Sequence, residues 1–289
     1  MRLGAIEAGG TKMVVGILDE SLKVLSSQTF PTRSPEETLP DLIGFFEGKK
    51  INALGIGSFG PVDVHQNSPT YGQILATPKL QWRNYPLLQT LKEALQVPCA
   101  LDTDVNAAAL CEQRIGAGKG VDNLLYLTVG TGIGGGLIVN GQPVHGALHP
   151  EWGHIGLQKT ANDLLKKSVC PYHDSCGEGL ASGPAMKERW GMPAQDLPDN
   201  HPAWALEAEY LAQICATALY TVSPEKIILG GGVMHHTALY PMIRKLVKEK
   251  INNYLSSPVI DDWDNLIVPP QFYPESGLYG AGILAQEAL

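Results

Sequence analysis

The feature that most constrains the fold is a Gly-Gly pair between two apolar runs at the start of the chain. Leu3–Ile6 and Met13–Leu18 are apolar or β-branched stretches, and such runs around a pair of glycines predict a β-hairpin. Because Gly9 and Gly10 carry no Cβ, the backbone N–H groups of the turn can approach an anion closely. The turn, which continues through Thr11 and Lys12, is therefore either a plain hairpin turn or a phosphate-binding one.

The hairpin pattern occurs a second time further along the chain. A strand is predicted at Asn123–Thr128, then a glycine-rich turn, then a strand at Gly136–Val139. This weak internal duplication predicts two α/β domains of related topology that face each other across a cleft. We expect the first domain to cover 1–117 together with a C-terminal helix at about 275–289, and the second to cover 118–274.

Hydrophobic periodicity predicts the remaining elements. Further strands are expected at Lys23–Thr29, Ala53–Gly57, Val97–Leu101, Lys226–Leu229 and Asn265–Val268, and helices at Pro86–Leu95, Asp104–Ile115, Ala181–Trp190, Ala203–Tyr220, Tyr240–Tyr254 and Ser276–Ala288.

Composition and charge exclude several classes of protein. The net charge is −8, and without a dense Lys/Arg cluster this argues against a nucleic-acid surface. Glu7 and Lys12 interrupt any apolar leader, and no run of about 18 apolar residues suggests a membrane span. We expect a cytoplasmic protein. Its five cysteines are an odd number, which makes metal binding or core packing better explanations than a disulfide framework.

Two more glycine clusters suggest nucleotide binding. In the segment Thr128–Gly136 the residues Gly130, Thr131, Gly132 and Gly134 predict a second phosphate-binding turn, with a flexible hairpin as the alternative. A third cluster, Gly230, Gly231 and Gly232, follows an apolar strand and precedes a helical stretch. That is the position at which α/β sheets bind nucleotides, beyond the carboxyl ends of their strands.

Asp104 is the candidate catalytic residue. It follows the strand predicted at Val97–Leu101 and opens an alanine-rich helix, so its carboxylate is expected to project from a strand end. There it could accept the proton of a substrate hydroxyl as that oxygen attacks a γ-phosphate. The alternative is that Asp104 only caps the helix, and both roles are compatible.

A cluster of soft ligands predicts a structural zinc site. Cys170, His173 and Cys176 are evenly spaced in one short segment, and His154 completes a Cys2His2 set. Four protein ligands leave no open position for a metal-bound water, which argues against a zinc hydrolase.

Two carboxylates lie near this segment in the sequence. Glu151 is one helical turn before His154, and Glu178 directly follows the metal-binding segment. Carboxylates accept strong hydrogen bonds from hydroxyl groups, so Glu151, His154 and Glu178 are candidates for binding a sugar. The alternative is that both carboxylates are ordinary surface charges.

Four motifs together resemble the ROK family of sugar kinases over nearly the whole chain. The segment Glu7–Thr11 resembles its first phosphate motif, with Glu7 where many members carry Asp. Gly57–Asp63 is similar to its Gly-x-Pro-Gly-Pro-Val segment, with Phe59 in place of Pro. Asp102–Ala109 resembles the stretch that carries the catalytic Asp, and Glu151–His154 resembles the Glu-x-Gly-His signature.

The resemblance implies specific roles. It implies that Asp104 is the catalytic base, that His154 contacts both sugar and zinc, and that Thr103 stands where a sugar-binding Asn is usual. The other implied sugar contacts are Gly60, Glu151 and Glu178. The form of the metal segment, with Cys170, His173 and Cys176, looks like the fructokinase branch.

As a whole, the resemblance implies a two-lobed actin-like ATPase (ribonuclease H-like) fold, Mg-ATP as cofactor and assembly as a homodimer. The activity that it implies is ATP:D-fructose 6-phosphotransferase. We expect the lobes to close over the substrates, and Glu7 to hold a magnesium-bound water.

Alternative functions remain open at this point. A glucokinase, mannokinase or N-acetylhexosamine kinase differs only in the hydroxyl arrangement of its hexose. Sugar-responsive repressors of the same family carry a DNA-binding helix-turn-helix before the kinase-like part, and a first strand at Leu3 leaves no room for one.

Overall fold

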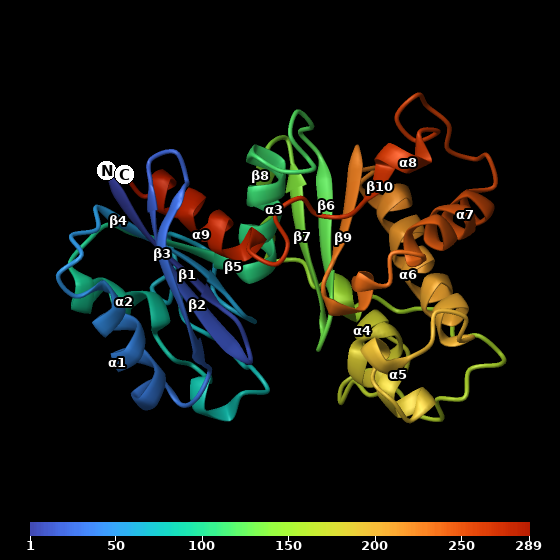
Figure 1. The fold of residues 1–289 in the computed structure, drawn as a ribbon, viewed down its shortest axis with the longest axis horizontal. Helices are drawn as coiled ribbons and strands as arrows, with labels where there is room; N and C mark the ends of the chain where they lie inside the picture. Colours follow the sequence, from blue (N-terminus) through green and yellow to red (C-terminus); the bar gives the residue numbers. More distant parts are fainter. The chain divides into compact units, whose positions relative to one another are not determined.

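The computed structural model describes residues 1–289, which form two compact units, and each unit is built on one five-stranded mixed sheet with helices (Figure 1). Unit 1 consists of Met1–Arg114, Pro143–Pro150 and Pro274–Leu289, and unit 2 of Ile115–Gln142 and Glu151–Tyr273. Neither unit is therefore a single continuous stretch of chain.

The sheet of unit 1 begins with the predicted hairpin. Its strands are β1 (Arg2–Ala8), β2 (Lys12–Asp19), β3 (Val24–Pro31), β4 (Ala53–Ser58) and β5 (Cys99–Thr103), in the order β3-β2-β1-β4-β5. β2 is antiparallel to both of its neighbours, whereas β1, β4 and β5 run parallel. The carboxyl ends of these three parallel strands consequently meet at one edge of the sheet.

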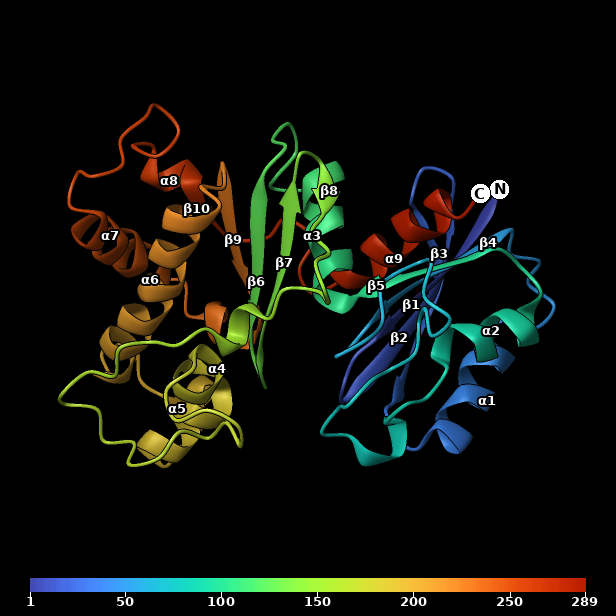
Figure 2. The ribbon, with the colours of Figure 1, turned by 180° about the vertical axis from the view of Figure 1, so that it is seen from behind.

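Helices cover both faces of this sheet. They are α1 (Pro35–Phe46), α2 (Leu87–Leu95), α3 (Asp104–Arg114) and α9 (Ser276–Glu287). Both views show α1 and α2 on one side of the sheet and α9 on the other (Figure 1 and Figure 2). The main core lies between the sheet and α1 with α2, and includes Ile6, Met13, Leu42 and Trp82, each at most 1% exposed.

Helix α1 is absent from the sequence-based expectation. It begins after Ser34, whose backbone N–H donates to the Glu37 carboxylate at 3.3 Å. Pro40 lies inside the helix, and an internal proline removes a backbone donor and normally ends a helix. Burial of Leu39, Leu42 and Phe46 against the sheet outweighs this local penalty.

On the opposite face, glycines let α9 approach the sheet closely. A Cβ on Gly55 of β4 would lie 1.8 Å from the carbonyl oxygen of Ala281, and one on Gly280 would lie 1.8 Å from that of Ala107. Both contacts are too short for any side chain, so helix α9 packs backbone to backbone on β4 and on α3.

The sheet of unit 2 repeats the theme of a hairpin followed by parallel strands. Its strands are β6 (Leu124–Val129), β7 (Ile133–Val139), β8 (Gln142–Pro143), β9 (Lys226–Gly230) and β10 (Ile267–Val268), in the order β10-β9-β6-β7-β8. β6 is antiparallel to β7 and parallel to β9. Strand β7 starts at Ile133 rather than at the predicted Gly136, so most of the expected glycine-rich turn is strand.

The helices of unit 2 also differ in detail from the expectation. They are α4 (Gly177–Ala181), α5 (Gly183–Trp190), α6 (Ala203–Thr221), α7 (Leu239–Ile251) and α8 (Trp263–Leu266), with short 3₁₀ turns η2 (Trp152–His154) and η4 (Gly232–His235). The helix predicted at Ala181–Trp190 corresponds to α5, which starts two residues later at Gly183, because Ala181 ends the preceding helix α4. Ser182 is extended between α4 and α5, and its hydroxyl oxygen caps α5 by accepting the Ala185 N–H.

The strand predicted at Asn265–Val268 is shorter than expected. Only Ile267 and Val268 pair with β9, because the preceding residues form α8. Among all the helices, none combines the length and the apolar character that crossing a membrane requires.

Candidate functional site

Three candidate segments of unit 1 follow the carboxyl ends of its parallel strands. The Gly9–Thr11 turn follows β1, the Phe59–Pro61 segment follows β4, and Asp104 follows β5. Ligands of α/β sheets bind at this edge. The parallel pairing therefore brings together segments that are almost 100 residues apart in the sequence.

The Gly9–Thr11 turn is held by its own backbone and by Thr32, the residue that follows β3. The Gly9 N–H donates to the carbonyl oxygens of Glu7 and Lys12 at 3.2 and 3.1 Å. The Thr32 hydroxyl donates to the Gly9 carbonyl at 2.7 Å, and the Thr32 N–H donates to that of Thr11 at 3.0 Å. Since the Gly9 donor is used inside the turn, an anion would be held by the N–H groups that follow it.

Asp104 is the first residue of α3 and is half-buried. The side chain that caps the helix is that of Thr103, whose hydroxyl oxygen accepts the Asn106 N–H at 3.0 Å. Asp104 Oδ1 accepts the N–H of the adjacent Val105 at 2.9 Å. The interpretation of Asp104 as a simple helix cap is thereby weakened.

Beside Asp104, the structure reveals a pair that sequence reasoning missed. His145 Nε2 lies 2.9 Å from Oδ2 of the buried Asp102, while Oδ1 of Asp102 accepts from Asn106 Nδ2 and from the Thr103 N–H, both at 2.7 Å. The hydrogen bond to Asp102 raises the pKa of His145, against an opposing effect of burial. These contacts fix the corner between β5 and α3 from which Asp104 projects.

His145 and His149 both lie outside helices and strands, and His149 is buried, at 8% exposed. Its Nε2 accepts the Val62 N–H at 3.2 Å, and burial lowers its pKa. A Cβ on Gly60 would lie 3.2 Å from the same ring. His145 and His149 thus connect segment Pro143–Pro150 to distant parts of the unit 1 sequence, through Asp102 and Val62.

Glu7 lies near the end of β1 and faces the start of α9. A Cβ on Gly277 would lie 2.5 Å from its carboxyl carbon. Burial raises the pKa of Glu7 to about 7, although the charge of Lys12 opposes this. A desolvated carboxylate next to the Gly9–Thr11 turn is chemically suited to an interaction with a cation or its bound water.

In unit 2, the glycine turn between β6 and β7 is joined to Glu178. Glu178 Oε2 accepts the Ile133 N–H at 3.1 Å, and a Cβ on Gly132 would lie 2.5 Å from the same oxygen. Desolvation, followed by repulsion from Glu178, raises the pKa of Glu151 to about 6 while the residue keeps contact with solvent. The two predicted sugar-binding carboxylates therefore interact with one another.

The remaining glycines of the second cluster have a packing role. The turn η2, which carries His154, lies directly on β7, where a Cβ on Gly153 would lie 1.8 Å from the Ile133 carbonyl oxygen. A Cβ on Gly135 would lie 2.6 Å from that of Trp152. Gly134 is itself inside β7 and pairs with Thr128, which leaves Gly130, Thr131 and Gly132 as the turn proper.

The third cluster also has a structural explanation. Gly231 has φ +94°, and a Cβ there would lie 2.3 Å from the carbonyl oxygen of Val129 at the end of β6. Gly230 ends β9 and Gly232 begins η4. The cluster thus lies at the carboxyl end of β9, next to the Gly130 turn at the carboxyl end of β6.

The four predicted metal ligands converge. One ligand atom each from His154, Cys170, His173 and Cys176 lies within 4.8 Å of the others. Sγ of Cys170 is 3.9 Å from His154 Nδ1 and 3.5 Å from His173 Nδ1, and Sγ of Cys176 is 3.7 Å from His154 Nδ1. Tetrahedral zinc, with its usual bond lengths, separates sulfur and nitrogen ligands by about 3.6 Å. The donor set and its spacing fit such an ion.

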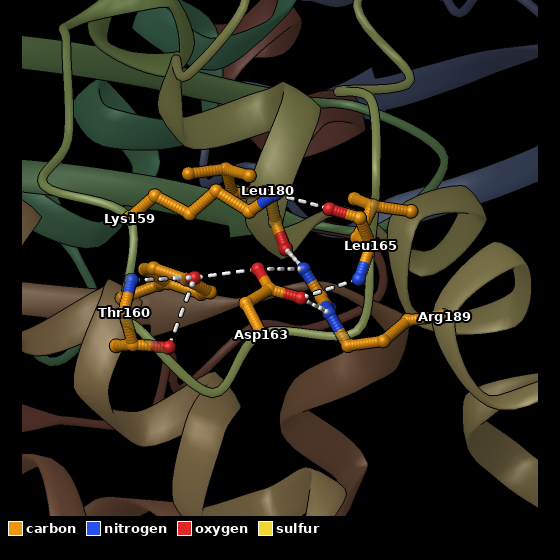
Figure 3. Close-up of polar contacts among 7 residues, drawn as sticks. Lys159, Thr160, Asp163, Leu165, Leu180 and Arg189 are labelled. Carbon is orange, nitrogen blue, oxygen red and sulfur yellow. Dashed lines mark hydrogen bonds and ion pairs between the residues drawn. The ribbon is translucent and has the colours of Figure 1, made fainter.

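Three of the four predicted metal ligands, Cys170, His173 and Cys176, lie in a long segment without helices or strands. Between η2 and α4 the chain forms only an isolated bridge, Gly156 to Cys176. Figure 3 shows Asp163 at the centre of a network within this stretch, where it forms a buried ion pair with Arg189 at 2.7 Å. Arg189 also donates to the Leu180 carbonyl in α4, and Tyr210 donates to Asp163.

This network tethers the stretch to α4, α5 and α6. Although burial alone would raise it, hydrogen bonds from Arg189 and Tyr210 hold the pKa of Asp163 below its usual range. The carboxylate is therefore charged at neutral pH. The position of Glu178, in α4, depends on the same contacts because Arg189 binds the end of that helix.

Comparison with known proteins agrees with this architecture. The ROK family model matches residues 3–288. The chain is 43% identical to a fructokinase from Pediococcus pentosaceus over 100% of its length and 99% of that protein, and 42% identical to one from Lactococcus lactis subsp. cremoris over 88% and 87%. A ROK family glucokinase from Streptomyces griseus, solved with glucose and AMPPNP, superposes with a TM-score of 0.77 at 25% identity, covering 99% of this chain and 100% of that one.

The chain belongs to the ROK family. The predicted fold class, the two-lobed α/β actin-like ATPase fold of ROK sugar kinases, is confirmed by the structural match. The prediction that the protein is a sugar kinase enzyme is confirmed at the level of that class by its full-length relatives.

Proposed function

We propose that the protein transfers the γ-phosphoryl group of ATP to the 6-hydroxyl of D-fructose. The fructokinases that it resembles support this substrate, since the similarity extends along the whole chain. The observation that carries the chemistry is the meeting of a phosphate-binding turn and the Asp104 carboxylate at one edge of the unit 1 sheet. A kinase needs both an anion site and a proton acceptor near the attacking hydroxyl.

In this proposal Asp104 is the general base. A bond forms between the fructose 6-oxygen and the γ-phosphorus as the bond from that phosphorus to the β–γ bridging oxygen breaks, and the hydroxyl proton passes to the Asp104 carboxylate. The Asp102, His145 and Asn106 contacts hold the start of α3 in place, so that the base is positioned before the substrate arrives.

The phosphate groups of ATP are assigned to backbone donors. In unit 1 the proposed donors belong to the Gly9–Lys12 turn. The sequence motifs suggest a phosphate-binding role for the Gly130–Gly132 turn and the glycines 230–232 as well. Magnesium would neutralise charge on the phosphates. Glu7 is the residue proposed to hold a water of that ion, since its carboxylate is buried beside the first turn.

Within unit 2, the residues proposed to contact the sugar are Glu151, His154 and Glu178. The ROK resemblance implies sugar contacts for Gly60, Thr103 and Asp104 as well. Zinc held by His154, Cys170, His173 and Cys176 would have a structural role, because four protein ligands close its coordination sphere. The imidazole of His154 and the Glu178 helix would then be oriented by the metal-binding segment.

An ADP-release assay with fructose, mannose, glucose and N-acetylglucosamine tests the substrate. We expect fructose to give the highest kcat/KM, and ³¹P-coupled NMR to show phosphate on the 6-oxygen of the product. A higher kcat/KM for glucose or mannose would replace fructose with that hexose. No ADP release with any of the four sugars would contradict the proposed function.

We further propose that the protein works in the cytoplasm as a homodimer. ATP is available there, and the thiols of Cys170 and Cys176 would stay reduced and able to bind metal. All five cysteines are free thiols. Sedimentation equilibrium tests the dimer, and a single species at 31.0 kDa would contradict it.

A further inference from the structure

Lys79 approaches the phosphate turn from a loop that the sequence motifs do not include. Its Cε lies 3.0 Å from the position that a Cβ on Gly10 would occupy. The side chain thus extends across the glycine turn, and it can do so because residue 10 has no side chain. Gly10 therefore makes room for a cation as well as exposing backbone donors.

The loop that carries Lys79 is firmly held. The Lys79 N–H donates to the hydroxyl of the buried Thr77, and the Lys79 carbonyl accepts the Trp82 N–H at 2.9 Å. The Trp82 ring is 1% exposed, and its Nε1 donates to the Arg33 carbonyl at 2.7 Å. Lys79 is consequently delivered to the turn by an anchored backbone rather than by a free surface loop.

Lys79 and the neighbouring cation Arg33 differ in their ion pairing. Both Lys79 and Arg33 line a cavity of about 300 Å³ together with Thr32, the residue that fixes the phosphate turn. Arg33 forms an ion pair with Asp41 at 2.6 Å, whereas Lys79 forms no ion pair with a carboxylate. Of the two, Lys79 is therefore the cation without a carboxylate partner.

We propose that Lys79 is a further catalytic residue, whose ammonium group binds the phosphoryl group that is being transferred. The proposal rests on the proposed kinase function. An ammonium ion beside a phosphate turn stabilises the negative charge that the equatorial oxygens carry in the transition state. Lys79 takes no part in proton transfer, which stays with Asp104.

Three variants test this role in the full-length, metal-loaded protein. Lys79→Gln removes the charge at nearly constant length, Lys79→Arg keeps it, and Arg33→Gln is the matched control from the same cavity. We expect Lys79→Gln to lower kcat about 100-fold, as for removal of one electrostatic contact to a transition state. KM for fructose should change little, Lys79→Arg should recover part of the loss, and Arg33→Gln should leave kcat unchanged.

Nucleotide binding separates a catalytic role from a structural one. If Lys79 binds the transferred group, Lys79→Gln weakens the binding of AMPPNP, measured by calorimetry, and leaves that of ADP unchanged. Equal weakening of both nucleotides, or a kcat for Lys79→Gln within about threefold of wild type, would overturn the proposal. Failure of the wild-type protein to phosphorylate any hexose would instead count against the proposed function.

A double-mutant cycle with Gly10→Ala adds an independent test. The alanine Cβ would displace the Lys79 side chain, so part of its cost in kcat should come from Lys79. We expect Gly10→Ala to cost less in the Lys79→Gln background than in wild type. Equal costs in the two backgrounds would contradict a shared action of the two residues.

Discussion

The two units order their candidate functional groups by different means. At the carboxyl edge of unit 1, Asp102 at the end of β5 forms hydrogen bonds with Asn106 in α3 and with His145 in the loop segment Pro143–Pro150. In unit 2, the ligands His154, Cys170, His173 and Cys176 lie in or beside a long segment without helices or strands. The first arrangement is formed by protein groups alone, whereas the second would also use the zinc ion proposed above.

This difference suggests that the candidate site of unit 1 is ordered by the protein alone, whereas the order of the corresponding segment of unit 2 depends on other contacts. A long irregular segment has few backbone hydrogen bonds of its own and must be held by other contacts. Here those contacts are the ion pair between Asp163 and Arg189 and, in the proposed zinc-bound protein, the bonds to the metal. We therefore expect perturbations to affect the two units separately, and the following predictions test that expectation.

Removal of zinc should have the largest effect. Structural zinc contributes about 10 kcal/mol or more to the folding of small zinc-binding peptides. We expect chelation to raise amide hydrogen exchange over residues 157–175 and to abolish sugar binding, while exchange at β1, β4 and β5 stays unchanged. Equal exchange with and without chelator in that segment would contradict the proposed dependence on metal.

Cysteine variants supply the control for this experiment. Cys176→Ser should lose bound zinc, measured by plasma emission spectroscopy. Cys99→Ser should retain it, because Cys99 lies in β5 and outside the ligand cluster. Protein that is purified without chelator and contains no zinc would remove the basis of the prediction.

Asp104→Asn should have the second largest effect. General-base contributions are typically about 100-fold or more, so we expect kcat to fall by at least that factor while fructose still binds in calorimetry. Because the Thr103 hydroxyl caps the helix, the thermal transition should change little. Retention of kcat within about tenfold would refute the assignment of Asp104 as base.

Asp163→Asn should destabilise unit 2 alone. Removing one partner of a buried ion pair costs about 3–5 kcal/mol, since the other charge is left uncompensated. The double variant Asp163→Asn with Arg189→Met should be less destabilised than Asp163→Asn, as measured by urea unfolding.

The ion pair should also make stability depend on pH. Because the pKa of Asp163 is lowered, the contribution of Asp163 to stability is complete above its ordinary pKa of 3.8 and is lost as the pH falls through the lower folded value.

His145→Asn should have the smallest effect, with a distinctive pH dependence. The raised pKa of His145 means that its contribution to stability is complete below the ordinary value of 6.5 and disappears as the pH rises through the folded value. A hydrogen bond to a charged group contributes about 1.5–3 kcal/mol. We expect the difference in unfolding free energy between wild type and variant to shrink from pH 6 to pH 8, and a constant difference would contradict this.

The sequence predicts local features of the site well. Short motifs place Gly9 and Gly10 in a turn, Asp104 at the start of a helix after a strand, and the two Cys and two His residues in one cluster, while their functional roles stay predictions. The two hairpins were also predicted, although the glycines of β7 were interpreted as turn. Gly135 in β7 is explained by the side chain that packs on it, since a Cβ there would lie 2.6 Å from that of Trp152, and that contact is not visible in the sequence.

Long-range contacts explain what sequence reasoning missed. His145 binds Asp102, a residue 43 positions away, and no local pattern marks either as a partner of the other. Lys79 reaches Gly10 only through the anchoring of Trp82. Helix α1 was missed for a different reason, because Pro40 is locally unfavourable and is tolerated only when the apolar face of the helix is buried.

The placement of α9 has a consequence for biosynthesis. Strand β4 is covered on one face by a helix that the ribosome makes after all of unit 2, and the glycine surface prepared for it remains open until then. During translation unit 2 can therefore finish folding before unit 1, whose sheet stays uncovered on the α9 side until the last residues are made. A nascent chain halted before residue 274 should accordingly be a substrate for chaperones.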